Sequence, residues 1–376
     1  MEHNHGRARK NLILRELPLL YVGGTAGLFI LFGNTWLADL SSPLWLVFVF
    51  LWLFTAVLWA ALAAVRHADA LAILLGEPYG TLVLTLSVIS IEVSMISAVM
   101  LHGANNPTMA RDAMFAVIMI VLNGMVGLSL LAGGWRHREQ HYNLEGAKSY
   151  LAVLIPLAVL SLVLPNYTIS TPGPNFSPFQ TVFLIIISFG LYGSFLAIQT
   201  VRHRQYFIDP KEAVEEHGRL QSEGAAQHYT FHTLLLIAYL VPVVVMAEKL
   251  AVPIDYVVET LHAPRTLAGL VVAALVVTPE AISAIGAARA NHLQRSVNIS
   301  LGSVLATIGL TVPAVLFIGL ITGRKLELGL PPTAIIMLTL TLLVSMVTFS
   351  SARSNVLLGA VHVLLFLAYI MLIFQP

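Results

Sequence analysis

LTLSVISIEVSMISAVM at residues 84–100 and LVVAALVVTPEAISAIG at residues 270–286 are the two stretches that decide the fold of this sequence. Both are apolar runs on the scale of a membrane-crossing helix, which needs about 20 residues. Each carries one glutamate, Glu92 or Glu280, away from its ends, and neither contains a basic residue. An ionisable group at that depth costs about 2.5–3.5 kcal/mol on insertion scales and therefore marks a functional site. Each carboxylate must pair with another helix, take up a proton or bind a cation.

The composition supports a membrane protein. The 376 residues are 57% hydrophobic and 10% charged, whereas about a quarter of the residues in a soluble domain are charged. A net charge of +1 provides no basic surface for nucleic acid. The absence of cysteine excludes disulfides and thiolate metal sites. No nucleotide-binding or zinc-protease motif is present, so neither an enzyme nor an ATP-driven pump is supported.

The apolar runs predict an all-α membrane protein of about eleven transmembrane helices, because lipid offers backbone groups no other partner. The predicted spans are 16–36, 43–65, 80–101, 113–134, 149–165, 179–201, 231–249, 266–288, 297–322, 332–350 and 355–374.

Lysines and arginines predict the orientation. With the N-terminus in the cytoplasm, fifteen of the 20 basic residues fall in inside segments, as the positive-inside rule requires. We therefore expect a multi-pass protein of the bacterial inner membrane with a cytoplasmic N-terminus and an outside C-terminus. Its predicted parts are a cytoplasmic tail (1–15), an extra first helix (16–42), a first repeat (43–201), a cytoplasmic loop (202–230) and a second repeat (231–376).

This topology places the two glutamates on helices of opposite direction. Glu92 lies on the third span and Glu280 on the eighth, and two similar segments in opposite orientation are the product of an inverted repeat of five helices. Such repeats hold their transport site near the bilayer midplane, so we expect the two carboxylates to meet there.

Oxygen-bearing side chains near the glutamates are candidate ligands for a hard cation. Ser90 and Thr278 precede the two glutamates by two residues, and the helix after Glu280 carries Asn298, Ser300 and Ser303. Hydroxyls in membrane helices also commonly bond to their own backbone, and Asn298 could equally join two helices. Pro279 lacks an N–H for the carbonyl of Leu275, so the helix is expected to kink or break before Glu280.

The segments 76–100 and 276–315, GEPYGTLVLTLSVISIEVSMISAVM and VVTPEAISAIGAARANHLQRSVNISLGSVLATIGLTVPAV, resemble the calcium/cation antiporter superfamily. The likeness is greatest to its bacterial ChaA-type Ca2+/H+ and Na+/H+ antiporters. This resemblance implies that Glu92 and Glu280 are the paired acidic residues of the repeats. It also implies exchange of cytoplasmic Ca2+, Na+ or K+ for external H+, with no resident cofactor.

The sequence departs from that family in its neutral ligands. Many calcium/proton exchangers carry Gly-Asn-x-x-Glu in both repeats, but this asparagine is missing before both Glu92 and Glu280. A family Gly-Ser pair survives as Gly302-Ser303 and is replaced by Ala116-Val117 in the first repeat. Fewer oxygen ligands leave sodium and potassium open beside calcium.

Two alternatives remain open from the residues. A cation channel could use the glutamates as a filter, but it would show no proton coupling. The acidic loop at 202–230 and histidines near the cytoplasmic surface, such as His232, could regulate transport in response to pH or could simply be solvated.

Overall fold

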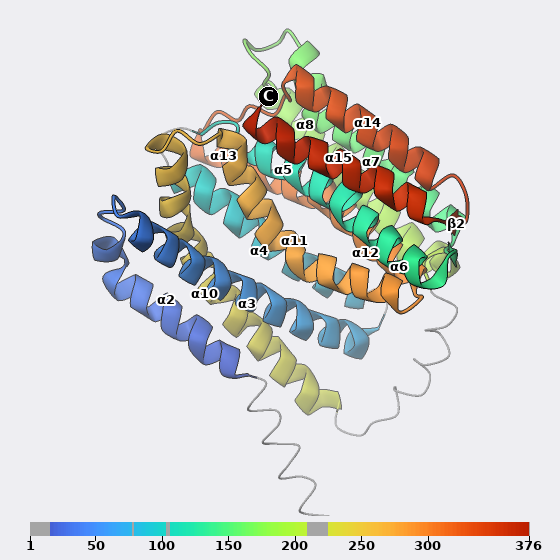
Figure 1. The fold of residues 1–376 in the computed structure, drawn as a ribbon, viewed down its shortest axis with the longest axis horizontal. Helices are drawn as coiled ribbons and strands as arrows, with labels where there is room; N and C mark the ends of the chain where they lie inside the picture. Colours follow the sequence, from blue (N-terminus) through green and yellow to red (C-terminus); the bar gives the residue numbers. More distant parts are fainter. Residues whose placement is uncertain (1–15, 77–78, 103–105, 209–224, 376) are drawn as a thin grey trace, which may run out of the picture. The chain divides into compact units, whose positions relative to one another are not determined.

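The structure is a computed structural model that describes residues 16–76, 79–102, 106–208 and 225–375 (Figure 1). Apart from two short strands it is built of helices, and each of the eleven predicted spans corresponds to one long helical segment. The prediction of an all-α membrane protein is therefore confirmed. The predicted tail at 1–15 and residues 209–224 of the predicted loop lie outside the described residues.

Ten helical segments are long and apolar enough to cross a membrane, and the eleventh, α14, is an apolar helix of 17 residues. Three spans contain a π-helical segment, so that α5–η1–α6, α8–η3 and α12–η5–α13 are each continuous. The bounds are α2 Leu17–Trp36, α3 Pro43–Leu75, α4 Tyr79–His102, α5 Met109–Met119, η1 Ile120–Met125, α6 Val126–His137, α7 Leu144–Leu162, α8 Pro178–Ala197, η3 Ile198–Arg202, α10 Ala225–Glu259, α11 Arg265–Arg289, α12 Leu293–Ala306, η5 Thr307–Thr311, α13 Val312–Thr322, α14 Pro332–Thr348 and α15 Val356–Phe374.

The predicted boundaries differ most at α10, which was expected at 231–249 but runs from Ala225 to Glu259, through Lys249 and Pro253. The next largest difference is the length of α3, which was expected to end at residue 65. Arg66 interrupts the apolar pattern, but the helix continues to Leu75 and ends only at Gly76. The φ of Gly76 is +65°, and its N–H donates to the carbonyl of Ala72. A charged residue ends an apolar run, whereas a helix commonly ends where the backbone turns left-handed at a glycine.

The helices form two compact units, each assembled from separate parts of the chain. Among the described residues, unit 1 contains α2, α3, α4 and α10. Within it α10 packs along α3, and α2 and α4 pack against both. Ala56, Ala60 and Ala64 recur every four residues on α3 and are fully buried. Such small side chains let membrane helices approach closely.

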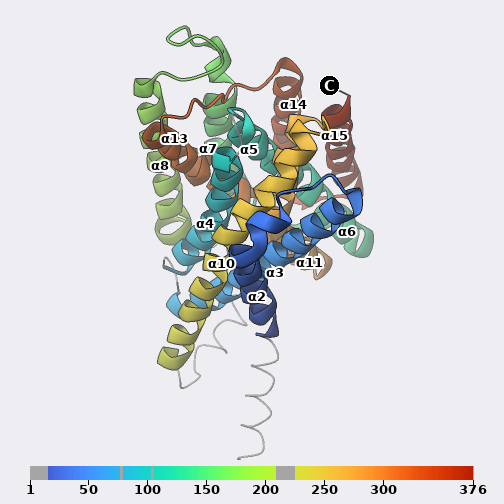
Figure 2. The same cartoon turned by 90° about the vertical axis from the view of Figure 1, so that its left-hand side faces the viewer.

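Unit 2 contains the remaining described helices, from α5 to α8 and from α11 to α15. Its packing exchanges elements between the two predicted repeats. The span α5–η1–α6 of the first repeat packs against α14 and α15 of the second, and α12–η5–α13 of the second packs against α7 and α8 of the first. Figure 2 shows α7, α8 and α13 on one side of this unit and α6, α14 and α15 on the other. The strands β1 (Gln140–His141) and β2 (Arg353–Ser354) pair antiparallel and join the loops before α7 and α15.

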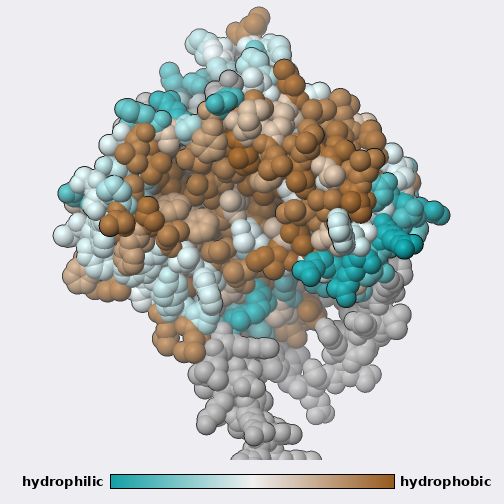
Figure 3. Space-filling model, in the orientation of Figure 1, coloured by the Kyte–Doolittle hydropathy of each residue, from teal (hydrophilic) through white to brown (hydrophobic). Residues whose placement is uncertain are grey.

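The contact between α6 and α15 depends on glycine. A Cβ atom on Gly359 would lie 2.7 Å from the backbone nitrogen of Leu131, and one on Gly127 would lie 2.9 Å from that of Val363. Real Cβ atoms do not approach backbone atoms this closely, so the two helices meet at nearly backbone distance. The outer faces of α14 and α15 are apolar (Figure 3). Their exposed large apolar side chains are Ile336, Leu340, Leu343, Met346, Val347, Leu357, Leu364, Leu367, Met371 and Phe374.

Candidate functional site

Glu280 lies on α11, which packs in unit 2 against α5, α6, η1 and α12. A close approach at Gly269 seats this helix on α5, because a Cβ there would lie 2.6 Å from the carbonyl carbon of Asp112. The Glu280 side chain is part-buried and accepts a hydrogen bond from the hydroxyl of Ser303 on α12. Of the predicted ligands in the second repeat, Ser303 is therefore the one that the structure brings to the carboxylate.

Thr278 faces away from Glu280 around α11. Two residues rotate a helix by about 200°, which places side chains on opposite faces. The hydroxyl of Thr278 donates to the carbonyl of Ala274 at 2.5 Å, one turn earlier. Thr278 is thus bonded to its own helix, the ordinary alternative for a hydroxyl in a membrane helix.

Pro279 does not break the helix. α11 continues from Arg265 to Arg289 with Pro279 inside it, so the expected break is absent. Proline removes one N–H from the helix, but the other backbone bonds remain, and neighbouring hydroxyls supply further bonds. Ser283 donates to the carbonyl of Pro279 at 3.1 Å, as Thr278 does to Ala274. A single missing bond is therefore tolerated within a helix held by its neighbours.

Asn298 and Ser300 are engaged away from the carboxylate. The Asn298 amide donates to the backbone carbonyl of Phe207, and its oxygen accepts from Gln294 at 2.9 Å. Ser300 donates to the carbonyl of Ser296 at 2.8 Å. Asn298 therefore joins α12 to the segment after α8, and a role for either side chain as an ion ligand would require these bonds to break.

Glu92 lies on α4 in unit 1, where α4 packs against α3 and α10. Its side chain is buried, with 2% of its surface exposed. Ser90 is exposed, and its hydroxyl donates to the carbonyl of Leu86 at 2.7 Å. As with Thr278, the spacing of two residues turns the hydroxyl away from the glutamate. Because Glu92 and Glu280 belong to different compact units, their meeting at one site stays a prediction.

A feature that sequence patterns did not reveal is a π-helix in the span after each carboxylate helix. η1 begins 28 residues after Glu92, and η5 begins 27 residues after Glu280. In both, a backbone N–H donates to the carbonyl five residues earlier, from Val126 to Val121 and from Val312 to Thr307. Insertions of this kind are frequent at functional sites. The internal duplication predicts such matched positions and itself stays a prediction.

A charged cluster in unit 1 joins the start of α2 to α3 and α10. Glu16 pairs with Arg66 at 2.8 Å and accepts from the Tyr239 hydroxyl at 3.0 Å. The buried His67 ring lies 3.3 Å from the same carboxylate and 2.8 Å, nitrogen to nitrogen, from His232. These bonds tie three helices together, and the pH response considered for His232 stays a prediction.

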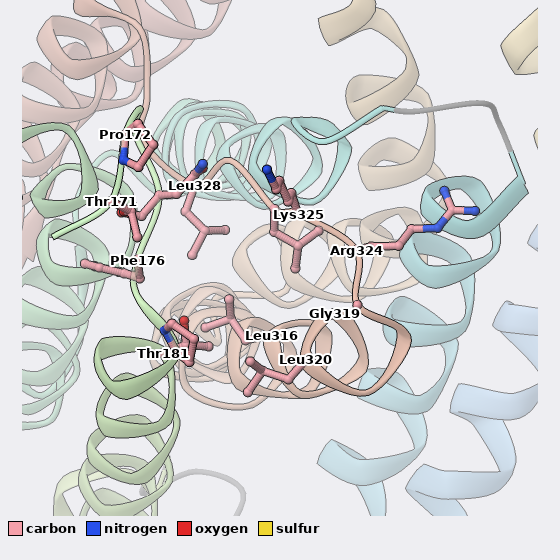
Figure 4. Close-up of a pocket in the computed structure, with 14 residues that line it drawn as sticks. Thr171, Pro172, Phe176, Thr181, Leu316, Gly319, Leu320, Arg324, Lys325 and Leu328 are labelled. Atoms are coloured by element: carbon pink, nitrogen blue, oxygen red, sulfur yellow. The ribbon is translucent and has the colours of Figure 1, made fainter.

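A cavity of about 360 Å³ lies in unit 2 where α8 begins and α13 ends (Figure 4). The described residues that line it include Arg324 and Lys325 but no carboxylate. Figure 4 shows the Arg324 side chain extending away from the other labelled residues. A cation would meet positive charge and no acidic ligand in this cavity, so it is not a candidate for the transport site.

Comparison with known proteins identifies relatives over most of the chain. The family model for the sodium/calcium exchanger protein matches residues 45–201 and 231–375. The putative ionic transporter y4hA of Sinorhizobium fredii (strain NBRC 101917 / NGR234) is 44% identical over 319 residues, covering 83% of this chain and 85% of that protein. The sodium-potassium/proton antiporter ChaA of Escherichia coli (strain K12) is 41% identical over 323 residues, covering 85% and 86%. The structure of native YfkE has the same fold, with a TM-score of 0.73 at 17% identity, covering 96% of this chain and all of that one.

Proposed function

We propose that Glu92 and Glu280 bind both the cation and the proton that this chain exchanges. The chain belongs to the sodium/calcium exchanger family and is a secondary transporter, a cation/proton antiporter. The observation that carries this proposal is the occurrence of one acidic residue inside each of two similar membrane helices. Glu92 is buried, and Glu280 is part-buried and hydrogen-bonded to Ser303. The transported ions are its substrates, and no resident cofactor is required by the mechanism.

Exchange follows from the cost of a bare carboxylate in a membrane. With the site open to the cytoplasm, the deprotonated glutamates bind a cation, and with the site open to the outside, protons displace it. An unoccupied pair of carboxylates is costly in a low-dielectric cavity, so the protein changes conformation only when each carboxylate holds a cation or a proton. Two carboxylates at one site would titrate as a coupled pair.

We propose Na+ and K+ as the main cations, with Ca2+ as a weaker substrate. The family asparagine is absent beside both glutamates, and the hydroxyl of Ser303 bonds Glu280. Ca2+ takes six to eight oxygen ligands, and the missing asparagines offer it fewer neutral oxygens than the calcium/proton exchanger pattern does. The 41% identical relative is named a sodium-potassium/proton antiporter, whereas relatives named Ca2+/H+ antiporters are 22% and 24% identical. A monovalent cation would leave one carboxylate protonated.

The proposed setting is a bacterial inner membrane, with a cytoplasmic N-terminus and an outside C-terminus. Lysine and arginine are in excess in the segments predicted to lie on the same side of the membrane as the N-terminus, and this excess supports the orientation. Protons would then enter the cell down their gradient as cations leave.

The test is transport by the purified protein in proteoliposomes with an imposed pH gradient. We expect uphill movement of Na+ and K+, weaker movement of Ca2+, and dissipation of the pH gradient on adding cation. Glu92→Gln and Glu280→Gln should each abolish exchange, whereas Glu248→Gln should transport normally because Glu248 is exposed and paired with Lys249. Only downhill cation flux without proton movement would contradict antiport and support a channel. Transport above about a tenth of wild type in a folded Glu92→Gln or Glu280→Gln variant would contradict the assigned residues.

A further inference from the structure

A buried polar network in unit 2 has no part in the ion site described above. Asn123, in the π-helix η1, donates from its amide nitrogen to the hydroxyl of Thr341 on α14 at 2.8 Å. Its amide oxygen lies 3.3 Å from Nδ1 of His362 on α15, and Nε2 of His362 lies 2.9 Å from the hydroxyl of Thr348. Asn123, Thr341 and His362 have no exposed surface, and Thr348 has 1%.

Met119 of α5 completes this network, because its sulfur accepts hydrogen bonds from the Asn123 amide and the Thr341 hydroxyl, both at 3.6 Å. A neutral imidazole with its proton on Nδ1 donates to the Asn123 oxygen and accepts the Thr348 hydroxyl on Nε2, a tautomer inferred from the hydrogen bonds. Buried polar networks whose members are all satisfied rigidify the elements that they join. Here the joined elements are η1, α14 and α15.

The π-helix that this network holds also borders the Glu280 helix. η1 packs against α11 and α12, which carry Glu280 and Ser303, as well as against α14 and α15. An i→i+5 turn is an uncommon backbone geometry that persists where its surroundings favour it. Asn123 and His362 supply hydrogen bonds at this turn. A shift of the turn would change how the span packs against α11.

We propose that His362 and Asn123 are positioning residues for the cation site: they hold η1 in its π-helical form and so set the placement of α11 and Glu280. This inference rests on the proposed function of Glu280. Neither residue touches the cation. Their effect passes through the backbone of η1, in the way that supporting residues orient the ligands of a metal site.

The experiment measures transport rate against cation concentration in proteoliposomes for five variants, of which Thr341→Val is the last. His362→Leu removes both ring bonds, and His362→Asn keeps a donor near the Nδ1 position, facing Asn123. His362→Gln instead keeps an acceptor near the Nε2 position, facing Thr348. Ser345→Ala is the matched control, because Ser345 lies between Thr341 and Thr348 on α14 and is fully buried, and its hydroxyl has no hydrogen-bond partner among the described residues.

We expect His362→Leu to raise the half-saturating cation concentration about tenfold, the scale of lost supporting bonds at metal sites, with a smaller effect on the maximal rate. His362→Asn should restore most of the affinity and His362→Gln little of it, while Ser345→Ala should match wild type. Thr341→Val removes the hydroxyl bonded to Asn123 and leaves His362 unchanged. It should also raise the half-saturating cation concentration, and it tests the inference if His362→Leu does not fold.

Three results would overturn the inference. They are an unchanged half-saturating concentration in folded His362→Leu or Thr341→Val, an equal shift in Ser345→Ala, and rescue by His362→Gln but not by His362→Asn. If wild type exchanges cations and any of these occurs, the positioning role fails and the proposed function stands. If wild-type protein drives no exchange, both fail.

Discussion

Ser303 and Ser300 lie one helical turn apart on α12, yet their hydroxyls have different partners. Ser303 donates to the carboxylate of Glu280, and Ser300 donates to the backbone of Ser296. A hydroxyl bonded to an ionised group contributes more than one bonded to a neutral carbonyl, and in a transport site its oxygen is also available to a cation. The difference between the two serines therefore isolates the contribution of one hydroxyl to the site.

We predict that Ser303→Ala raises the half-saturating cation concentration about tenfold, since hydrogen bonds to charged groups are worth about 1.5–3 kcal/mol. Ser300→Ala should change it little, because its hydroxyl bonds only its own helix. Transport kinetics in proteoliposomes, with folding checked by size-exclusion chromatography, measure both. Equal effects from the two substitutions would show that Ser303 acts through packing.

At the scale of elements, α11 combines an uninterrupted helix with an internal proline. Sequence rules predict that proline disrupts a helix interior, but tertiary packing on α5 and α12 holds α11 together. The π-helices η1 and η5 depart from regular α geometry, in the span after α4 and in the span after α11. The irregular backbone near the candidate site therefore lies beside the glutamate helix rather than within it.

Pro279→Ala should weaken cation affinity while leaving measurable turnover, because alanine would restore the N–H that bonds the carbonyl of Leu275. The first repeat has Ile91 at the matching position, so proline tunes the site rather than creates it. The half-saturating cation concentration and the maximal rate, measured together, separate the two effects. An unchanged affinity would assign Pro279 to packing alone.

The α6–α15 contact should be sensitive to a single methyl group. Gly359→Ala would place a Cβ 2.7 Å from the Leu131 nitrogen, so the helices must separate. We expect destabilisation of about 1–3 kcal/mol, the usual cost of overpacking. Gly193→Ala on α8 is the control, since nothing lies within 4 Å of a Cβ there. Thermal unfolding in detergent measures both, and equal melting temperatures would contradict the close approach.

At the scale of the whole molecule, the two predicted repeats contribute interleaved helices to unit 2. The π-helix-bearing span of each repeat packs against the last two helices of the other. Neither repeat can therefore assemble its part of unit 2 alone. Glu280 belongs to this unit, and Glu92 lies with α3 and α10 in unit 1. One site shared by both glutamates therefore stays a prediction.

The absence of native cysteine allows a direct test of this shared site. In a Glu92→Cys/Glu280→Cys variant, we expect a short bifunctional thiol reagent to form an intramolecular cross-link, seen as a mass increase in the intact protein. Carboxylates sharing one cation at 2.3–2.6 Å per ligand would lie within about 12 Å of each other. Each single-cysteine variant is a control for non-specific labelling. Failure to cross-link with reagents up to that span, in protein whose thiols are both reactive, would argue for separate sites.

The sequence alone determined the number and type of the helices and the two acidic positions. Long apolar runs have no alternative to helix in lipid, and a buried carboxylate is too costly to lack a function. Only the tertiary structure decided which polar groups meet. Ser303 bonds Glu280, whereas the nearer Thr278 points to the opposite face, and Asn123 meets His362 across 239 residues. Such contacts depend on the rotation of each helix and on which helix packs beside it. The pattern of apolar residues predicts the rotation of each helix only weakly in this protein, because apolar side chains of membrane helices can face lipid as readily as protein.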